Sequence, residues 1–182
     1  AFSLNFIMAI SLMIIYKYLS YKEYLSEMDG LTGVMGRKMF FDICESITAQ
    51  TPPTQCCFIF IDVDYFKQIN DTFGHVTGDD VLTNIAQKLL REFKEYGKIG
   101  RLGGDEFSIM IDHPIRKQEL IRKFDIFEKE ISGLLSDSHK VSCSIGAYYF
   151  NTPQNYQTIY ANAYKMLYKE KERGRACWVI NE

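Results

Sequence analysis

Residues 56–63, Cys-Cys-Phe-Ile-Phe-Ile-Asp-Val, constrain the fold of this chain most. An apolar run of this length predicts a strand buried on both faces, at the centre of a sheet. The run carries Asp62 at its end, and a second apolar stretch, residues 107–111, directly follows Asp105 and Glu106. Two neighbouring carboxylates repel each other unless a divalent cation lies between them. Two apolar strands that each carry carboxylates at one end therefore predict a two-metal site for phosphate chemistry.

The rest of the pattern mixes strands and helices without strict alternation, which predicts an α+β domain with helices packed on a sheet. Residues 98–102 and 107–111 form a predicted hairpin around Gly-Gly-Asp-Glu. The other predicted elements are a short amphipathic helix after a hinge at 29–33, a helix that Asp79 begins, a charged helix at 114–135, a strand at 140–150, a helix from 153 to 174 and an edge strand at 178–180.

Composition narrows the ligand class. The 21 Lys and Arg residues do not exceed the 23 Asp and Glu residues, and the net charge is −2. Proteins that grip long nucleic acids usually show a basic excess, so we expect no nucleic acid partner but a small anionic ligand. The five cysteines form no CxxC pattern and lie mostly beside apolar residues, which indicates a reducing compartment.

Residues 1–28 differ from the rest of the chain. The run is almost uncharged until Lys17, and Tyr16, Tyr18 and Tyr21 then accompany the first charges. This pattern favours the end of a membrane span with an interfacial anchor, which would place the following domain at the inner, cytoplasmic face of the membrane. The alternative is a signalling helix that pairs with its twin in a dimer. Residues 29–182 would form the second domain.

Several polar residues are candidates for binding a nucleotide. Lys67 lies where a loop enters a helix, and Lys171 and Arg175 could reach a polyphosphate together. For Lys171 alone, interaction with the helix dipole is the simpler interpretation. Asn70 and Asp79 could read guanine, because a carboxylate accepts both donors on one guanine edge. A helix N-cap at Asp79 and a turn at Asn70 are equally compatible with their positions.

Five motifs, in this order and spacing, resemble the GGDEF family of diguanylate cyclases over residues 29–178. The motifs are Asp-Gly-Leu-Thr-Gly (29–33), Asp-Val-Asp-Tyr-Phe-Lys-Gln-Ile-Asn-Asp (62–71), Gly-His-Val-Thr-Gly-Asp (74–79), Arg-Leu-Gly-Gly-Asp-Glu-Phe (101–107) and Tyr-Lys-Glu-Lys-Glu-Arg-Gly-Arg (168–175). The resemblance implies a palm-like nucleotidyl cyclase fold with a central, mostly antiparallel sheet.

The resemblance also implies the reaction: two GTP molecules condense to cyclic di-GMP and release two pyrophosphates. The catalytic residues would be Asp62, Asp105 and Glu106, with two Mg²⁺ ions (or Mn²⁺) on Asp62, Asp105 and the carbonyl of Val63. A homodimer would be required, since each domain carries one GTP and each 3′-hydroxyl attacks the partner's α-phosphate. The implied substrate-binding residues are Asn70 and Asp79 for guanine, and Tyr65, Phe66, Lys67, Lys171 and Arg175 for the phosphates.

The chain departs from the family pattern at three places. Gly36 and Ala176 stand where many members carry Asn, and residues 94–97, Lys-Glu-Tyr-Gly, replace an Arg-x-x-Asp that binds product as an inhibitor. We therefore expect no product inhibition through residues 94–97. The alternatives to a cyclase are a catalytically inactive GTP-binding module, an enzyme that makes a mixed guanine–adenine dinucleotide, and a membrane-tethered interaction module. Asp79 argues against the mixed product, because that variant replaces it.

Overall fold

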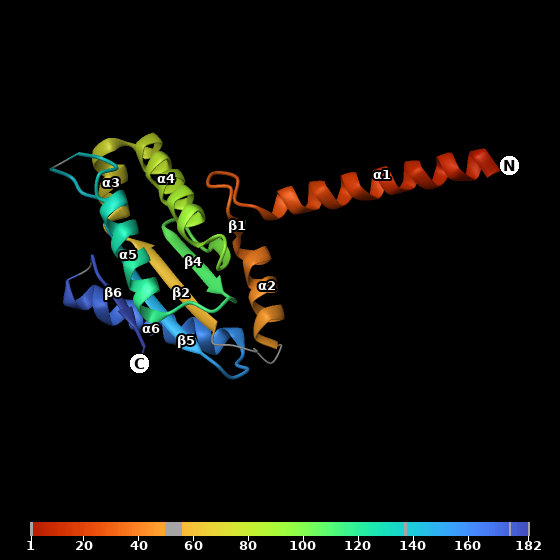
Figure 1. The fold of residues 1–182 in the computed structure, drawn as a ribbon. Helices are drawn as coiled ribbons and strands as arrows, with labels where there is room; N and C mark the ends of the chain where they lie inside the picture. The colour runs from red at the N-terminus through yellow and green to blue at the C-terminus, as the bar shows by residue number, and fades with distance from the viewer. Residues whose placement is uncertain (1, 50–55, 137, 175, 182) are drawn as a thin grey trace.

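A computed structural model describes residues 2–49, 56–136, 138–174 and 176–181 (Figure 1). Its elements follow one another as α1 (Phe2–Glu27), β1 (Met35–Gly36), α2 (Arg37–Ala49), β2 (Cys56–Val63), α3 (Phe66–Phe73), α4 (His75–Phe93), β3 (Gly97–Arg101), β4 (Glu106–Ile111), α5 (Lys117–Ile131), β5 (Cys143–Phe150), α6 (Tyr156–Arg173) and β6 (Trp178–Ile180). The domain is α+β, as predicted.

The described strands form one sheet in the order β1-β3-β4-β2-β5-β6. Strand β2 is central and pairs antiparallel with β4 on one side and β5 on the other. Strands β3 and β4 form the predicted antiparallel hairpin, whereas the edge strands β1 and β6 pair parallel with their neighbours. The expectation of a central, mostly antiparallel sheet flanked by helices is confirmed.

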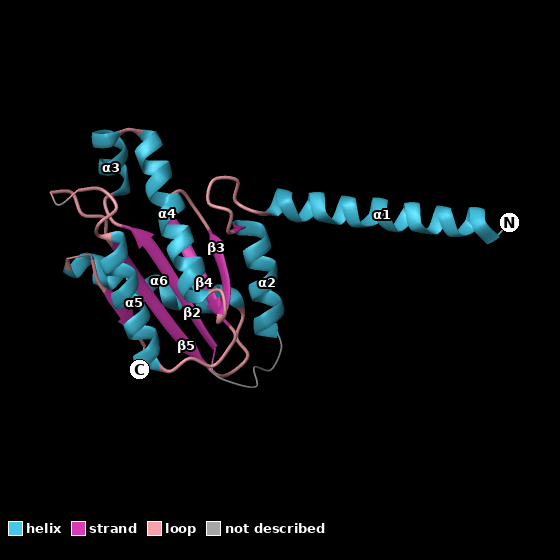
Figure 2. Ribbon diagram, turned by 45° about the horizontal axis from the view of Figure 1, so that its top comes forward, coloured by secondary structure: helices cyan, strands magenta, loops and turns pink. Residues whose placement is uncertain are grey.

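Helices cover both faces of the sheet, so β2 is buried on both sides. Figure 2 shows α4 and α5 in front of the strands and α6 behind them. On the first face, Ile59 and Ile61 of β2 share one apolar cluster with α4 and α5. On the second face, Phe58 and Phe60 join a cluster formed with α2 and α6. The continuous apolar run of β2 follows from this two-sided burial.

Four predicted starts differ from the observed ones. Strand β5 begins at Cys143 rather than at residue 140, and helix α6 begins at Tyr156 rather than at residue 153. Helix α4 begins at His75, so Asp79 lies in its second turn, and the N-cap interpretation of Asp79 is wrong. The first turn, His-Val-Thr-Gly, has weak helix propensity, and tertiary packing overrides it. Helix α5 begins at Lys117, three residues after the predicted start at Pro114. Strand β1, only two residues long, carries no sequence signal of its own.

Helix α1 projects away from the rest of the molecule (Figure 1). Its apolar side chains, such as Ile7, Ile14 and Leu25, are more than half exposed. Within the part of the chain that the structure describes, no helix is long and apolar enough to cross a bilayer, so the expected membrane span receives no support. The helix meets the domain closely at Gly36, where a Cβ atom would lie 2.7 Å from the carbonyl oxygen of Glu27.

Candidate active site

The predicted carboxylates meet at one end of the central strands. Asp62 of β2 lies directly opposite Glu106 of β4 in the antiparallel register. Side chains of such a pair project from the same face of the sheet, with Cβ atoms about 5 Å apart. The backbone N–H of Val63 donates to the carbonyl oxygen of Asp105 at 3.1 Å, which ties the Gly-Gly-Asp-Glu turn to the end of β2. Residues from separate motifs therefore converge as expected.

Lys171 of α6 completes this cluster. Its Nζ lies 2.5 Å from Asp62 Oδ1, and the two side chains are 21% and 14% exposed. Both residues line a cavity of about 380 Å³ whose wall also includes Glu106, Tyr164 and Tyr168. Burial raises the pKa of Asp62, the Lys171 ammonium lowers it, and the carboxylates of Asp105 and Asp64 raise it, so that the net shift is upward. The electrostatic environment of Asp62 thus favours a bound cation.

The surroundings of Asp64 differ from those of Asp62, although only one residue separates them. Its side chain is 3% exposed. It accepts hydrogen bonds from the hydroxyls of Ser142 (2.8 Å) and Ser144 (2.7 Å) and from the backbone N–H of Ala176 (3.0 Å). Asp64 thereby anchors the segment after α6 to the strand that carries Asp62. The sequence analysis assigned no separate role to Asp64; the available signal was the pair of Ser142, which directly precedes β5, and Ser144 on β5.

The turn from β2 into α3 has the geometry of an anion site. Tyr65 adopts a left-handed conformation (φ 55°) as the residue before α3, an uncommon state for a residue other than glycine. The turn aims the N-terminus of α3 outward, where the first N–H groups, including those of Phe66 and Lys67, lack partners within the helix. Lys67 is exposed at this end. Such N-termini attract phosphate groups.

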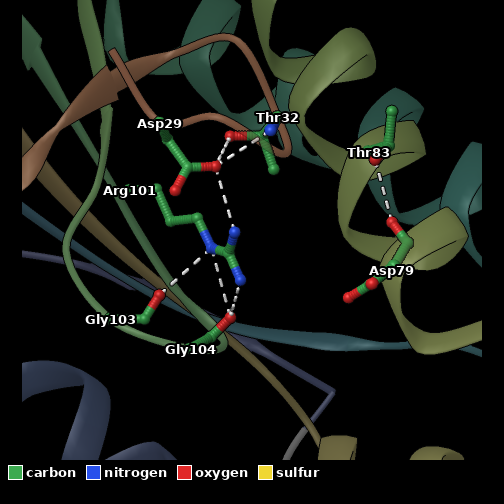
Figure 3. Close-up of polar contacts among 7 residues, drawn as sticks. All are labelled: Asp29, Thr32, Asp79, Thr83, Arg101, Gly103 and Gly104. Carbon is green, nitrogen blue, oxygen red and sulfur yellow. Dashed lines mark hydrogen bonds and ion pairs between the residues drawn. The ribbon is translucent and has the colours of Figure 1, made fainter. Parts of the chain in front are cut away.

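Asn70 and Asp79 come from two different helices but lie near each other. Asn70 Oδ1 would be only 1.9 Å from a Cβ atom at residue 78, so its side chain contacts α4 next to Asp79. Asp79 is exposed, and its backbone carbonyl accepts a hydrogen bond from the Thr83 hydroxyl at 2.9 Å (Figure 3). The side chain of Asn70 thus packs against α4 one residue before the exposed Asp79.

Arg101 holds the turn that presents Asp105. Its Nη1 lies 3.0 Å from Asp29 Oδ1, and its Nη2 donates to the carbonyl of Gly104 at 2.7 Å (Figure 3). Asp29 in turn accepts hydrogen bonds from the N–H and hydroxyl of Thr32. This network joins the hinge after α1 to the Gly-Gly-Asp-Glu turn. Neither Arg101 nor Asp29 was among the predicted site residues, although both belong to recognised motifs.

The structure leaves one predicted residue unplaced. Arg175 lies outside the described residues, so its expected phosphate contact has no structural account. Among the described residues, no cluster of three or more His, Cys, Asp or Glu side chains could hold a metal ion by itself. The donors present are oxygen atoms, which fit Mg²⁺, and Mg²⁺ usually binds one or two carboxylates plus substrate phosphates. The set of Asp62, Asp105 and the Val63 carbonyl fits that pattern.

The chain is similar in sequence to several known proteins. It is 34% identical over 155 residues to the diguanylate cyclase DosC of Escherichia coli (strain K12), covering 81% of this chain and 34% of DosC. It is 33% identical over 169 residues to the uncharacterized protein YhcK of Bacillus subtilis (strain 168), covering 87% of this chain and 47% of YhcK. The chain thus spans between about a third and a half of the length of these relatives.

Solved structures give the same result for the fold. One similar structure contains the coiled coil and GGDEF domain of DgcB from Caulobacter crescentus in complex with c-di-GMP, with a TM-score of 0.85, 23% identity, and coverage of 96% of this chain and 95% of that one. Another is the diguanylate cyclase SiaD from Pseudomonas aeruginosa in complex with its activator SiaC, with a TM-score of 0.78, 26% identity, and coverage of 98% and 72%.

The family model for the diguanylate cyclase GGDEF domain matches residues 26–177, which include every motif singled out above. This chain therefore belongs to the GGDEF family of diguanylate cyclases.

Proposed function

We propose that this chain is an active diguanylate cyclase, which condenses two GTP molecules into cyclic di-GMP and releases two pyrophosphates. The main supporting observation is the convergence of Asp62, Glu106 and Lys171 from three elements around one cavity. The cyclase relatives support the same reaction, since DosC carries that name. An intact set of carboxylates also argues against a module that only binds GTP.

The metal ligands would be the carboxylates of Asp62 and Asp105 and the carbonyl oxygen of Val63. Two Mg²⁺ ions, or Mn²⁺, would neutralise the triphosphate and stabilise the charge that develops on its oxygens. Glu106, opposite Asp62, would be the second essential carboxylate of the turn. The hydrogen bonds of Arg101 would keep Asp105 in place. This placement matters because a displacement of about 1 Å at a catalytic group can lower the rate about 10²-fold.

The phosphates would bind between the N-terminus of α3 and the end of α6. The backbone at Tyr65 and Phe66 and the side chains of Lys67, Lys171 and Arg175 would supply the positive charge. In each half-reaction the 3′-oxygen of one GTP would form a bond to the α-phosphorus of the other. The bond from that phosphorus to the bridging oxygen would break, and pyrophosphate would leave.

Guanine would bind at the surface shared by α3 and α4. The carboxylate of Asp79 would accept the ring N–H and the exocyclic amine of guanine, while the amide of Asn70 would contact the same base. Adenine lacks this pair of donors and would leave the carboxylate unsatisfied, so discrimination against ATP should be strong.

Catalysis would require a homodimer, because each domain would hold a single GTP. We propose that residues 29–182 form the cyclase domain and that residues 1–28 form a pairing helix. The exposed apolar residues of α1 support this division, since a second copy could cover them. The reaction would take place in the cytoplasm, where its substrate is found, and five cysteines without a disulfide motif suit that compartment.

One experiment tests the proposal directly. The full chain is incubated with GTP, with ATP, and with both, in the presence of Mg²⁺, and the products are analysed by mass spectrometry. We expect cyclic di-GMP from GTP only, and loss of product in Asp105→Asn. Asp112→Asn, which follows the opposite end of β4, is the matched control and should keep full activity. GTP binding without product would contradict the proposal, and so would an active Asp105→Asn variant.

A further inference from the structure

Gly78 occupies a place in α4 where helix propensity alone would favour another residue. It is the last residue of the first turn of the helix and is buried. Glycine inside a helix is destabilising relative to alanine, because it loses more backbone freedom on folding. A glycine at such a position therefore needs a packing or functional reason.

The reason is the side chain of Asn70. A Cβ atom on residue 78 would lie 1.9 Å from Asn70 Oδ1, 3.0 Å from Asn70 Cγ and 3.3 Å from Phe66 Cζ. The carboxamide thus fills the volume that any other side chain at residue 78 would require. Since ordinary contacts are about 3.5 Å, a methyl group would displace the amide oxygen by about 1.5 Å.

Close packing, more than hydrogen bonding, fixes the position of the Asn70 side chain. Its Oδ1 is buried and has no hydrogen-bond partner within the described part of the chain. A buried amide oxygen without a partner is costly, and such violations of local rules are expected at functional sites. The close fit against Gly78 and Phe66 therefore fixes the position of the amide, one residue before Asp79 on α4.

We infer that Gly78 is a positioning residue of the guanine subsite: its missing side chain leaves the space that places Asn70 next to Asp79. This inference rests on the proposed function, because Asn70 and Asp79 are assigned to guanine there. Gly78 itself would not contact the base. It would act only by fixing where the Asn70 amide lies.

Nucleotide binding tests the inference with the full chain. The probe is a GTP analogue with a methylene group between the α- and β-phosphates, whose dissociation constant is measured by calorimetry with Mg²⁺. We expect Gly78→Ala and Asn70→Ala each to weaken binding about tenfold, the value of one lost hydrogen bond. The double variant Gly78→Ala/Asn70→Ala should bind no worse than either single variant. Additive losses, or unchanged binding in Gly78→Ala, would overturn the inference.

The matched control is Gly133→Ala, since a Cβ atom there meets nothing within 4 Å. It should leave both binding and melting temperature unchanged. A weakened affinity in this control as well would overturn the inference, because the effect would then not be specific to residue 78.

Melting temperatures separate this inference from the proposed function. If a clash with the Asn70 side chain is what destabilises Gly78→Ala, this variant should have a lower melting temperature than the wild type. Adding Asn70→Ala should then restore the melting temperature in the double variant, whether or not GTP binds. A wild-type chain that binds no analogue but shows this rescue would refute the proposed guanine site and leave the steric part intact. Gly78→Ala without any loss of melting temperature would refute the steric part.

Discussion

Replacing Lys171 with methionine should make the stability of the domain depend on divalent metal. In the structure the Lys171 ammonium lies 2.5 Å from Asp62, and both side chains are largely buried. Methionine keeps the length of the side chain but removes the charge. Asp62 would then lie next to the carboxylates of Asp105 and Asp64 without a compensating cation.

The expected size of the effect follows from the burial of this pair. Breaking a fully buried ion pair costs about 3–5 kcal/mol, and exposed pairs contribute about 0.2–1 kcal/mol. For side chains that are 21% and 14% exposed we expect an intermediate loss of about 2 kcal/mol without metal. For a domain of this size the melting temperature should fall by about 4–8 °C.

Added Mg²⁺ should reverse much of this loss, because the ion replaces the missing ammonium. In the wild type the metal must first displace Lys171 from Asp62. Mg²⁺ should therefore raise the melting temperature of Lys171→Met more than that of the wild type, as a ligand stabilises the state it binds. Turnover should still fall by about 10²-fold, since the positive charge that Lys171 would place next to the phosphates is lost.

The assay is thermal unfolding of the full chain with EDTA or with increasing Mg²⁺. Lys169→Met, an exposed change on the same helix, is the matched control and should resemble the wild type. In the double variant Asp62→Asn/Lys171→Met, Mg²⁺ should no longer raise the melting temperature. Equal Mg²⁺ increments in the wild type and Lys171→Met would refute the view that Lys171 and the metal compete for Asp62.

Two further predictions concern stability. Ala176→Asn should stabilise the domain by about 1 kcal/mol in urea unfolding, because residue 176 has φ 50° and asparagine tolerates the left-handed region better than alanine. Ala176→Val should destabilise it, and the opposite order would contradict the argument. Glu128→Gln should stabilise the domain at pH 8 by about 1 kcal/mol, a value reduced for partial exposure, and have little effect at pH 5. Burial foremost, then the charges of Asp125 and Asp64, raises the pKa of Glu128 from 4.5 to about 7.

The sign of the pH effect follows from proton linkage. Between the ordinary pKa of Glu128 and its raised value, the folded state binds more protons than the unfolded state, so stability falls as pH rises from 4.5 to about 7. Glutamine keeps the neutral form at every pH and removes this slope. Glu95→Gln, whose side chain is 81% exposed, is the control and should show no such difference. A Glu128→Gln variant that is stabilised equally at both pH values would contradict the assignment.

Local sequence patterns predicted the parts of the fold that depend on burial along one element. The apolar run 56–63 became the central strand because helices cover both sheet faces. The predicted apolar stripe of α6 is buried, including Ile159, Ala163 and Leu167. The hairpin of β3 and β4 also follows local rules, since apolar strands flank a glycine-rich turn. These features depend only on residues that are close in sequence and on which face of each element is buried.

The start of α4 could not be predicted in this way. Its first turn contains residues with weak helix propensity, and no side chain caps it by a hydrogen bond. Packing of α4 against the sheet and α3 decides that boundary instead. Asp79, which local rules would place at the helix start, consequently lies in the second turn.

The sequence by itself determined the α+β fold, the family and the convergence of the motifs on one carboxylate-rich edge. Only the tertiary structure decided how each polar group is used. It placed Lys171 on Asp62, made Asp64 an anchor for Ser142, Ser144 and Ala176, and fitted Asn70 against Gly78. These partners are far apart in sequence or on different helices, and periodicity along one element carries no information about such contacts.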